Sequence, residues 1–153
     1  MLLRLWMAGL LASAMAGAQK YDGPPPAKPD LPYLKQAATL IPLEVAEARE
    51  EKGKDGAVLT IDGAESRVKT PISLPIFILK AEKLAPERLQ LYKLEVKGGY
   101  REFGRNPPEV IHMEVTRLNA GGLVRIAVSD PLEAGEYALG GQDSRQVFCF
   151  QVF

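Results

Sequence analysis

The sequence has few of the side chains that most often carry chemistry in proteins. Its 153 residues include one His (His112), one Cys (Cys149) and one Trp (Trp6). A lone Cys cannot form an intramolecular disulfide, so the core must stabilise the fold without one. A blue-copper site needs two His and a Cys, and the common zinc sites need more such ligands than this chain has. We therefore expect neither a metal nor another cofactor.

The chain also lacks an excess of either charge and a recognisable catalytic motif. Nineteen basic side chains balance nineteen acidic ones, which gives no electrostatic reason to expect nucleic acid or an anionic membrane as partner. No Gly-x-Ser-x-Gly nucleophile elbow is present. Cys149 lies in an apolar stretch, where a thiol usually behaves as an inert hydrophobic group, and His112 alternates with apolar residues on the polar side of a strand pattern. These absences favour a non-enzymatic protein without catalytic residues.

The first eighteen residues have the pattern of a cleavable signal peptide. A short basic start with Arg4 is followed by an apolar run from Leu5 to Met15 and by the small residues Ala16-Gly17-Ala18. The run is shorter than the roughly 20 apolar residues that a membrane-spanning helix needs. We expect cleavage after Ala18 and export, to the periplasm or to the exterior, with no membrane span afterwards.

Two segments follow the leader before clear strand patterns begin. Residues 19–35 are expected to be a solvated, extended linker, because the stretch from Tyr21 to Pro32 contains five Pro, Pro32 included. Residues 36–153 then form the folded domain, in which 36–56 is ambiguous. Leu43 to Lys52 is rich in helix formers, but its apolar positions fit neither a helical stripe nor strict alternation. A helix and a charged hairpin arm both remain open there.

The rest of the chain has the alternation and turn signals of β-structure. About seven strands with turns every 8–12 residues predict an all-β fold, a single antiparallel β-sandwich with an immunoglobulin-like Greek key. A change of phase near Tyr92-Lys93 indicates a bulge or a strand that changes sheets, and Gly98-Gly99 predicts a tight hairpin. The segments with strand patterns are Ala57–Ile61, Pro75–Glu82, Arg88–Lys97, Tyr100–Phe103, Ile111–Thr116, Leu123–Val128, Glu136–Leu139 and Gln146–Phe153.

The most specific local motif is structural. Tyr137 follows Gly135 by two residues at the corner between two strands, as in the tyrosine corner of Greek-key sandwiches, where the Tyr hydroxyl bonds to upstream backbone. Gly135 would supply a permissive backbone angle and Leu132 a core anchor. The stretch from Asp130 to Phe153 resembles the closing strands of immunoglobulin-like or fibronectin-type domains. It is also similar to small exported bacterial proteins of unassigned function, a resemblance that implies a fold and a compartment but no activity.

These features predict an exported, non-enzymatic binding or assembly module, an accessory subunit of a cell-envelope complex that meets another envelope protein through its surface or an edge strand. If the last strand is an edge, another chain can add to it; if it is central, it is core. One alternative is a carbohydrate-binding module that uses Tyr or Phe around the 98–99 hairpin, although the rings could instead cap the core. A small hydrolase is less favoured, and the oligomeric state stays open. The candidate interaction residues are Tyr92, Tyr100, Phe103, Phe148, Phe150 and Phe153.

Overall fold

The computed structural model describes residues 20–54, 56–104, 109–118, 121–141 and 144–153, so the leader and Asp55 lie outside the described residues. Within these ranges the chain is built from strands, with one short 3-10 turn, η1 (Pro86–Arg88), and no α-helix. The described residues contain no helix with the length and apolar character needed to cross a membrane. The expected all-β, antiparallel, sandwich-like architecture is confirmed at this level.

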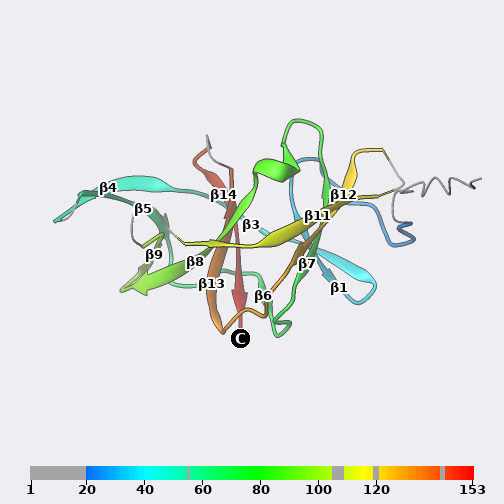
Figure 1. Cartoon of the computed structure of the whole chain (residues 1–153). Helices are drawn as coiled ribbons and strands as arrows, with labels where there is room; N and C mark the ends of the chain where they lie inside the picture. Colours follow the sequence, from blue (N-terminus) through cyan, green and yellow to red (C-terminus); the bar gives the residue numbers. More distant parts are fainter. Residues whose placement is uncertain (1–19, 55, 105–108, 119–120, 142–143) are drawn as a thin grey trace, which may run out of the picture.

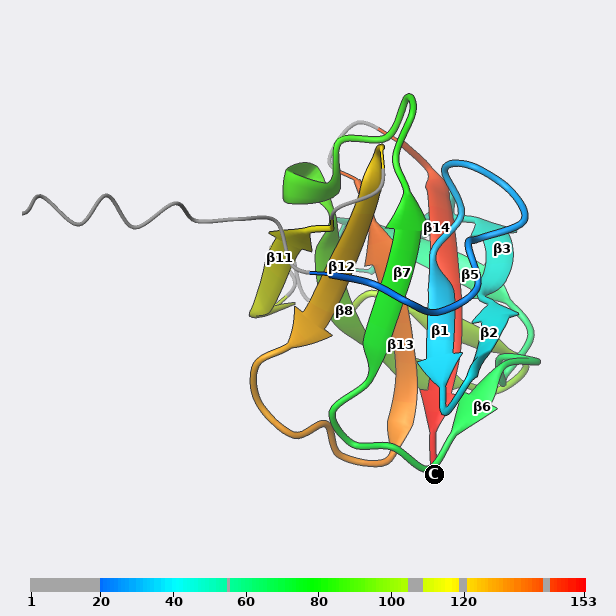
Figure 2. The same ribbon diagram turned by 90° about the vertical axis from the view of Figure 1, so that its right-hand side faces the viewer.

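A five-stranded antiparallel sheet forms one layer of the sandwich (Figure 2). Its strand order is β11-β12-β7-β1-β2. The third strand in this order, β7, contains the apolar run at residues 76–79, which is rich in strong strand formers. It lies in the centre of the sheet, where both of its faces are covered. The bounds are β1 (Tyr33–Gln36), β2 (Thr39–Pro42), β7 (Ile76–Lys80), β11 (Met113–Arg117) and β12 (Leu123–Val128).

A larger sheet forms the second layer, with the order β3-β14-β13-β8-β9-β5-β4 and two short strands attached at its sides, β10 to β8 and β6 to β14. All pairings are antiparallel except that of β6 with β14. The bounds are β3 (Glu44–Glu47), β4 (Arg49–Gly53), β5 (Gly56–Asp62), β6 (Lys69–Thr70), β8 (Gln90–Lys97), β9 (Tyr100–Glu102), β10 (Val110–Ile111), β13 (Gly135–Gly140) and β14 (Gln146–Val152).

The main core lies between the two sheets and is centred on aromatic rings. Phe150 of β14 stacks on Tyr137 of β13 with ring centroids 5.5 Å apart, and it meets Phe77 of β7 at 5.2 Å. Each of these three side chains is 1% exposed or less. Full burial of one such ring contributes about 1.5–3 kcal/mol, so β14 is central to the stability of the sandwich.

The larger sheet curls back so that a second, smaller core forms on its outer face. The strands β9, β5 and β4, here called the outer lobe, lie on the far side of β13 and β14 from the five-stranded sheet (Figure 1). Ala48, Ile61 and Phe103 of this region pack against Ala138 and Cys149, which point away from the main core. The curl gives both faces of β13 and β14 apolar neighbours.

Strand β8 serves both cores, which explains its change of phase. Its first residues pair with β13, and its last ones pair with β9 of the outer lobe. Leu91 is buried in the main core and Leu94 in the second core. The register with β13 stays constant from Gln90 to Leu94, so the change reflects a second packing layer and no bulge.

The Pro-rich segment lies against the sandwich. It crosses the outer face of the five-stranded sheet (Figure 2), where Tyr21 packs with Ile78 and Leu123. The carboxylate of Asp30 accepts backbone N–H bonds from residues 82–84 at 2.9 to 3.2 Å, and strand β1 begins at Tyr33. The segment expected as a solvated linker over 19–35 therefore ends earlier, before Tyr33, and lies against the sandwich with most of its side chains exposed.

The ambiguous segment at 36–56 also consists of strands. Residues 43–52, which the sequence leaves open between helix and hairpin arm, form β3 and most of β4, and β4 pairs with β5 as a hairpin. The described ranges hold fourteen strands, more than the seven or so expected. The number is higher because several strands are short, and because the chain passes from one sheet to the other within stretches that the sequence pattern does not divide. Examples are β2 and β3, separated by the buried Leu43, and β10 and β11, separated by His112.

Because β14 lies between β13 and β3, a chain that ends before Gln146 should not fold. The truncation removes Phe148 and Phe150 from the main core and takes away the pairing partner of three strands, β13, β3 and β6. We expect no cooperative thermal transition by circular dichroism. The control is Phe153→Ala in the full chain, which alters a side chain 68% exposed and should leave the transition in place. Cooperative melting of the truncated chain would show that β14 is dispensable.

Candidate functional site

The most unusual polar residue of the described structure is a buried arginine. Arg101 of β9 is 1% exposed and lies at one end of the second core. The Gly98-Gly99 turn, with Gly98 at φ +60°, joins β8 and β9 so that Lys97 faces Tyr100 across a two-residue hairpin. This register places Arg101 on the same face as the buried ring of Phe103 two residues later, toward the protein interior.

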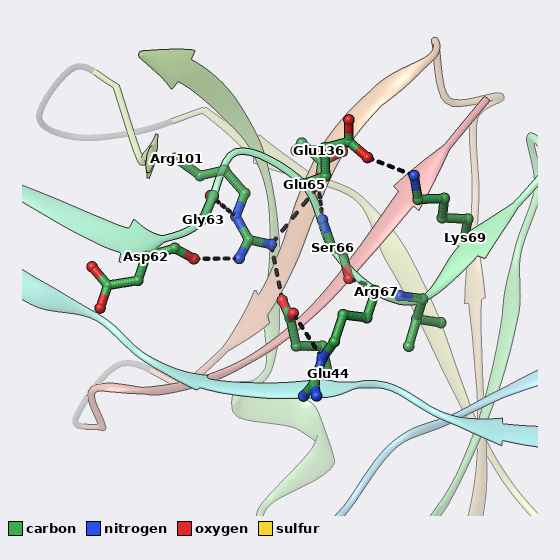
Figure 3. Close-up of polar contacts among 10 residues, drawn as sticks. Glu44, Asp62, Gly63, Glu65, Ser66, Arg67, Lys69, Arg101 and Glu136 are labelled. Carbon is green, nitrogen blue, oxygen red and sulfur yellow. Dashed lines mark hydrogen bonds and ion pairs between the residues drawn. The ribbon is translucent and has the colours of Figure 1, made fainter. Parts of the chain in front are cut away.

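Four hydrogen-bond and ion-pair partners surround the guanidinium of Arg101 (Figure 3). Nε donates to the carbonyl of Gly63 and Nη2 to the carbonyl of Asp62, both at 2.8 Å. Nη1 donates to Oε1 of Glu44 at 2.9 Å and lies 3.8 Å from Oε1 of Glu136. One planar side chain therefore joins β9 to the end of β5, to β3 and to β13.

Glu136 is the less well satisfied carboxylate of this cluster. Its side chain is 3% exposed, and Oε1 accepts the backbone N–H of Ser66 at 2.6 Å. Oε2 is buried and has no hydrogen-bond partner among the described residues. Burial raises the pKa of Glu136, which the Ser66 N–H and the charge of Arg101 offset only in part. The carboxyl group therefore keeps its proton to a higher pH than an exposed glutamic acid does.

Glu44 connects the buried cluster to the surface. Its side chain is 10% exposed and lies between Arg101 on the inside and Arg67, whose Nε is 3.6 Å from Oε2, on the outside. The Arg67 side chain is 83% exposed. Beside it runs a groove of about 500 Å³ between β3 and the end of β5, walled by Val45, Glu47 and Asp62 among others.

The structure separates the aromatic residues that the sequence groups as an interaction surface. Phe148 and Phe150 are 3% and 0% exposed in the main core, so neither can contribute to an exposed surface as predicted. The reason is that β14 is a central strand whose even-numbered residues face the five-stranded sheet. Phe153, at 68% exposed, remains at the surface.

The rings near the 98–99 hairpin do not form a joint platform either. Tyr92 and Phe103 pack edge to face, with centroids 5.5 Å apart and planes at 71°, and both belong to the second core. The Tyr92 hydroxyl bonds to the side chain of Gln90. Tyr100 alone of the three is exposed, at 39%. The positions of Tyr92 and Phe103 agree with the alternative in which these rings cap a core.

The corner motif at 132–137 is present, with one changed role. The Tyr137 hydroxyl donates to the carbonyl of Glu133 at 2.7 Å, which is the upstream backbone bond expected, and Leu132 is buried in the main core. Gly135 does not have a positive φ, so the expected role as a permissive backbone position is wrong. A Cβ there would lie 3.2 Å from Cε of Lys93, whose ammonium pairs with Glu133, so Gly135 leaves room for that side chain.

The two residues considered for chemistry, Cys149 and His112, lie in different surroundings. Cys149 is 0% exposed, and burial raises its pKa to about 12, which keeps the thiol protonated. His112 is exposed at the junction of β10 and β11 and lines a groove with Lys93 and Glu133. Among the described residues, no group of three or more His, Cys, Asp or Glu is arranged to hold a metal ion.

Sequence reasoning missed the cluster of Arg101, Glu44 and Glu136, because charged side chains are normally assigned to solvent. One signal could have identified Arg101. Phe103 lies two residues after it on the same strand, and an inward Phe103 requires an inward Arg101. The two glutamates have no comparable signal, since their burial depends on the curl of the larger sheet. Comparison of the chain with protein-family models, with curated proteins and with solved structures finds no match in any of the three.

The raised pKa of Glu136 predicts a stability loss at higher pH. The folded state binds this proton more tightly than the unfolded state, so the free energy of unfolding falls as pH rises from about 4.3 through the raised pKa. Glu136→Gln keeps an oxygen for the Ser66 N–H and cannot ionise. Urea denaturation at pH 5 and pH 8 should therefore show a smaller decline for this variant than for the parent chain. An unchanged decline would mean that Glu136 is not the titrating group. Glu114→Gln, which alters an exposed carboxylate of β11 in the other sheet, is the matched control.

Proposed function

We propose that the protein is an exported, non-enzymatic binding module that serves as an accessory subunit of a cell-envelope complex. The leader pattern of residues 1–18 supports export. The Tyr137 hydroxyl bond supports an immunoglobulin-like Greek key as the underlying fold, because this bond is a feature of such sandwiches. Domains of this kind commonly act through their surfaces, with function located in particular sites and not in the fold itself.

The observation that carries the proposal is the direction in which the fixed polar groups point. Arg101, Glu44 and Glu136 bond to one another and to backbone, and they hold strands together. An enzyme needs such groups aimed at a substrate. The described surface instead offers exposed apolar side chains. Val45, Leu59, Val96 and Tyr100, on and near the outer lobe, are 39–51% exposed, and Leu74, Val110 and Phe153, elsewhere, are 44–68% exposed. Exposed apolar groups of this kind suit contact with another protein.

Carbohydrate binding is supported less well by the same residues. A sugar platform needs aromatic faces that are open to solvent, and two of the three candidate rings pack on each other in the second core. Tyr100 alone remains for stacking. We therefore place the protein partner first, and binding to a glycan array that is lost on Tyr100→Ala would reverse this order.

The experiment is crosslinking of the full chain, leader included, in its own host. A photoreactive residue is placed at the exposed Val96, which pairs with β9, and, as a control, at the exposed Lys28, whose N–H bonds to Tyr33 of the five-stranded sheet. We expect the chain in the extracytoplasmic fraction and a discrete crosslinked envelope protein that depends on position 96. A chain that stays in the cytoplasm, or that crosslinks to nothing from either position, would contradict the proposal.

A further inference from the structure

Residues 20–32, here called the strap, cross the outer face of the five-stranded sheet (Figure 2). No residue of the strap belongs to a strand, and five of its residues are Pro, which have no backbone N–H to donate. Side-chain contacts attach it to the sandwich instead. They are made by Tyr21 near its start, by the buried Pro26 in its middle and by Asp30 near its end.

The ring of Tyr21 is held in a defined position at the start of the strap. It packs with Ile78 and Leu123 of the sheet, and burial raises the pKa of its hydroxyl. The hydroxyl donates to the carbonyl of Pro24 at 2.7 Å, so that the ring lies back over Gly23. A Cβ at Gly23 would lie 2.5 Å from the Tyr21 oxygen. The ring therefore fits in this place only because residue 23 has no side chain.

Asp30 fastens the other end of the strap. Its N–H donates to the carbonyl of Lys80 at 2.8 Å, and its carboxylate accepts the backbone N–H groups of residues 82–84. Successive N–H groups that converge on one carboxylate form a favourable anion-binding concavity. The docked strap is thus fixed at both ends, and its start cannot move away from the sheet unless Tyr21 leaves its place.

Along the chain, the docked Tyr21 lies very close to the expected end of the leader. The bond after Ala18 comes three residues before Tyr21, so the two are at most about 10 Å apart. A folded domain of this length has a radius of gyration of about 14 Å. A protease holds an extended stretch of chain on both sides of the bond that it cuts. While Tyr21 is docked, the sandwich occupies the space that a protease needs on the carboxyl side of Ala18.

We propose that the docked strap and the cut after Ala18 exclude each other, so that the leader is removed while the strap is open and the strap closes on the five-stranded sheet afterwards. This inference rests on the proposed export and names a step that controls it. The cut is a hydrolysis, in which the bond between Ala18 and Gln19 breaks and water supplies OH to the Ala18 carbonyl carbon and H to the Gln19 nitrogen.

The order of the two events follows from how proteases act on folded chains. Cleavage within a folded protein depends on the fraction of molecules in which the cut segment has opened locally. A chain that folds completely before it meets signal peptidase should therefore keep its leader for longer than an unfolded one. The strap makes removal of the leader an early step and closure over Ile78 and Leu123 a late one.

The test compares the cleavage of two substrates by purified signal peptidase. One is the full chain of residues 1–153, folded in mild detergent, and the other is a peptide of residues 1–32, which has no sheet on which to dock. Gly23→Ala should displace the Tyr21 ring and leaves the residues at the cut unchanged. Gly23 does not have a positive φ, so Ala suits its backbone. Lys28→Ala, at an exposed side chain of the same strap, is the control.

We expect the folded chain to be cut at least about tenfold more slowly than the peptide. Gly23→Ala should speed the cut of the folded chain about fivefold, because the partly buried ring no longer holds the strap, and should leave the rate for the peptide unchanged. Lys28→Ala should change neither rate. Tyr21→Ala is a second way to release the strap, and the thermal transition by circular dichroism checks that each variant is folded.

Equal rates for the folded chain and the peptide would overturn the inference and leave the proposed export standing. So would an effect of Gly23→Ala that is equal in the two substrates, or that is absent from a folded variant. If signal peptidase does not cut the peptide at all, residues 1–18 are no cleavable leader, and the proposed export fails together with the inference. The binding function is tested separately, by the crosslink at position 96.

Discussion

The contact between Arg101 and its two glutamates determines how the outer half of this molecule is built. A buried guanidinium is costly unless charges and acceptors surround it. Here the acceptors come from the turn after β5 and the charges from β3 and β13. The outer lobe can therefore rest on the sandwich in one position, in which all these segments converge. The apolar contacts of the second core, such as Phe103 with Tyr92, then supply the burial that offsets the desolvation.

This arrangement has consequences at both ends of the larger sheet. Strand β14 becomes central, with β13 on one side and β3 on the other, so the apolar ladder at the end of the chain is core. Its neighbour β3 is a short strand that Glu44 holds to Arg101. The cost of the cluster is visible in Glu136, whose Oε2 lacks a hydrogen-bond partner among the described residues.

Local patterns in the sequence predicted those parts of the fold that depend on local chemistry. The Gly98-Gly99 hairpin, the strand Leu123–Val128 and the Tyr137 hydroxyl bond lie where alternation and turn residues placed them. The phase change near Tyr92 also reflected a real feature, since β8 packs in two cores. In each case the residues that form the pattern lie within a few positions of the structural feature that they predict.

The remaining features depend on contacts between distant segments, which a single sequence does not display. The charged β4 resembles a helix in composition, and only pairing with β5 makes it a strand. Residues 20–32 have the composition of a linker. They lie against the protein because the five-stranded sheet offers them an apolar face, which their own sequence does not reveal. Glu136 pairs with a residue 35 positions away in the chain and bonds to Ser66 at a separation of 70. The candidate site was missed for this reason, because it is made by the curl of the sheet.

A double-mutant cycle between Arg101 and Glu44 tests the central claim most directly. The free energy of unfolding is measured for the parent chain, Arg101→Met, Glu44→Gln and the double variant, alongside the same cycle for the exposed pair of Arg145 and Glu50. If the buried contact joins the outer lobe to β3, its coupling energy should exceed about 1.5 kcal/mol, and that of the exposed pair should stay below about 1 kcal/mol. Equal, small coupling in both cycles would show that the cluster does not hold the lobe in place.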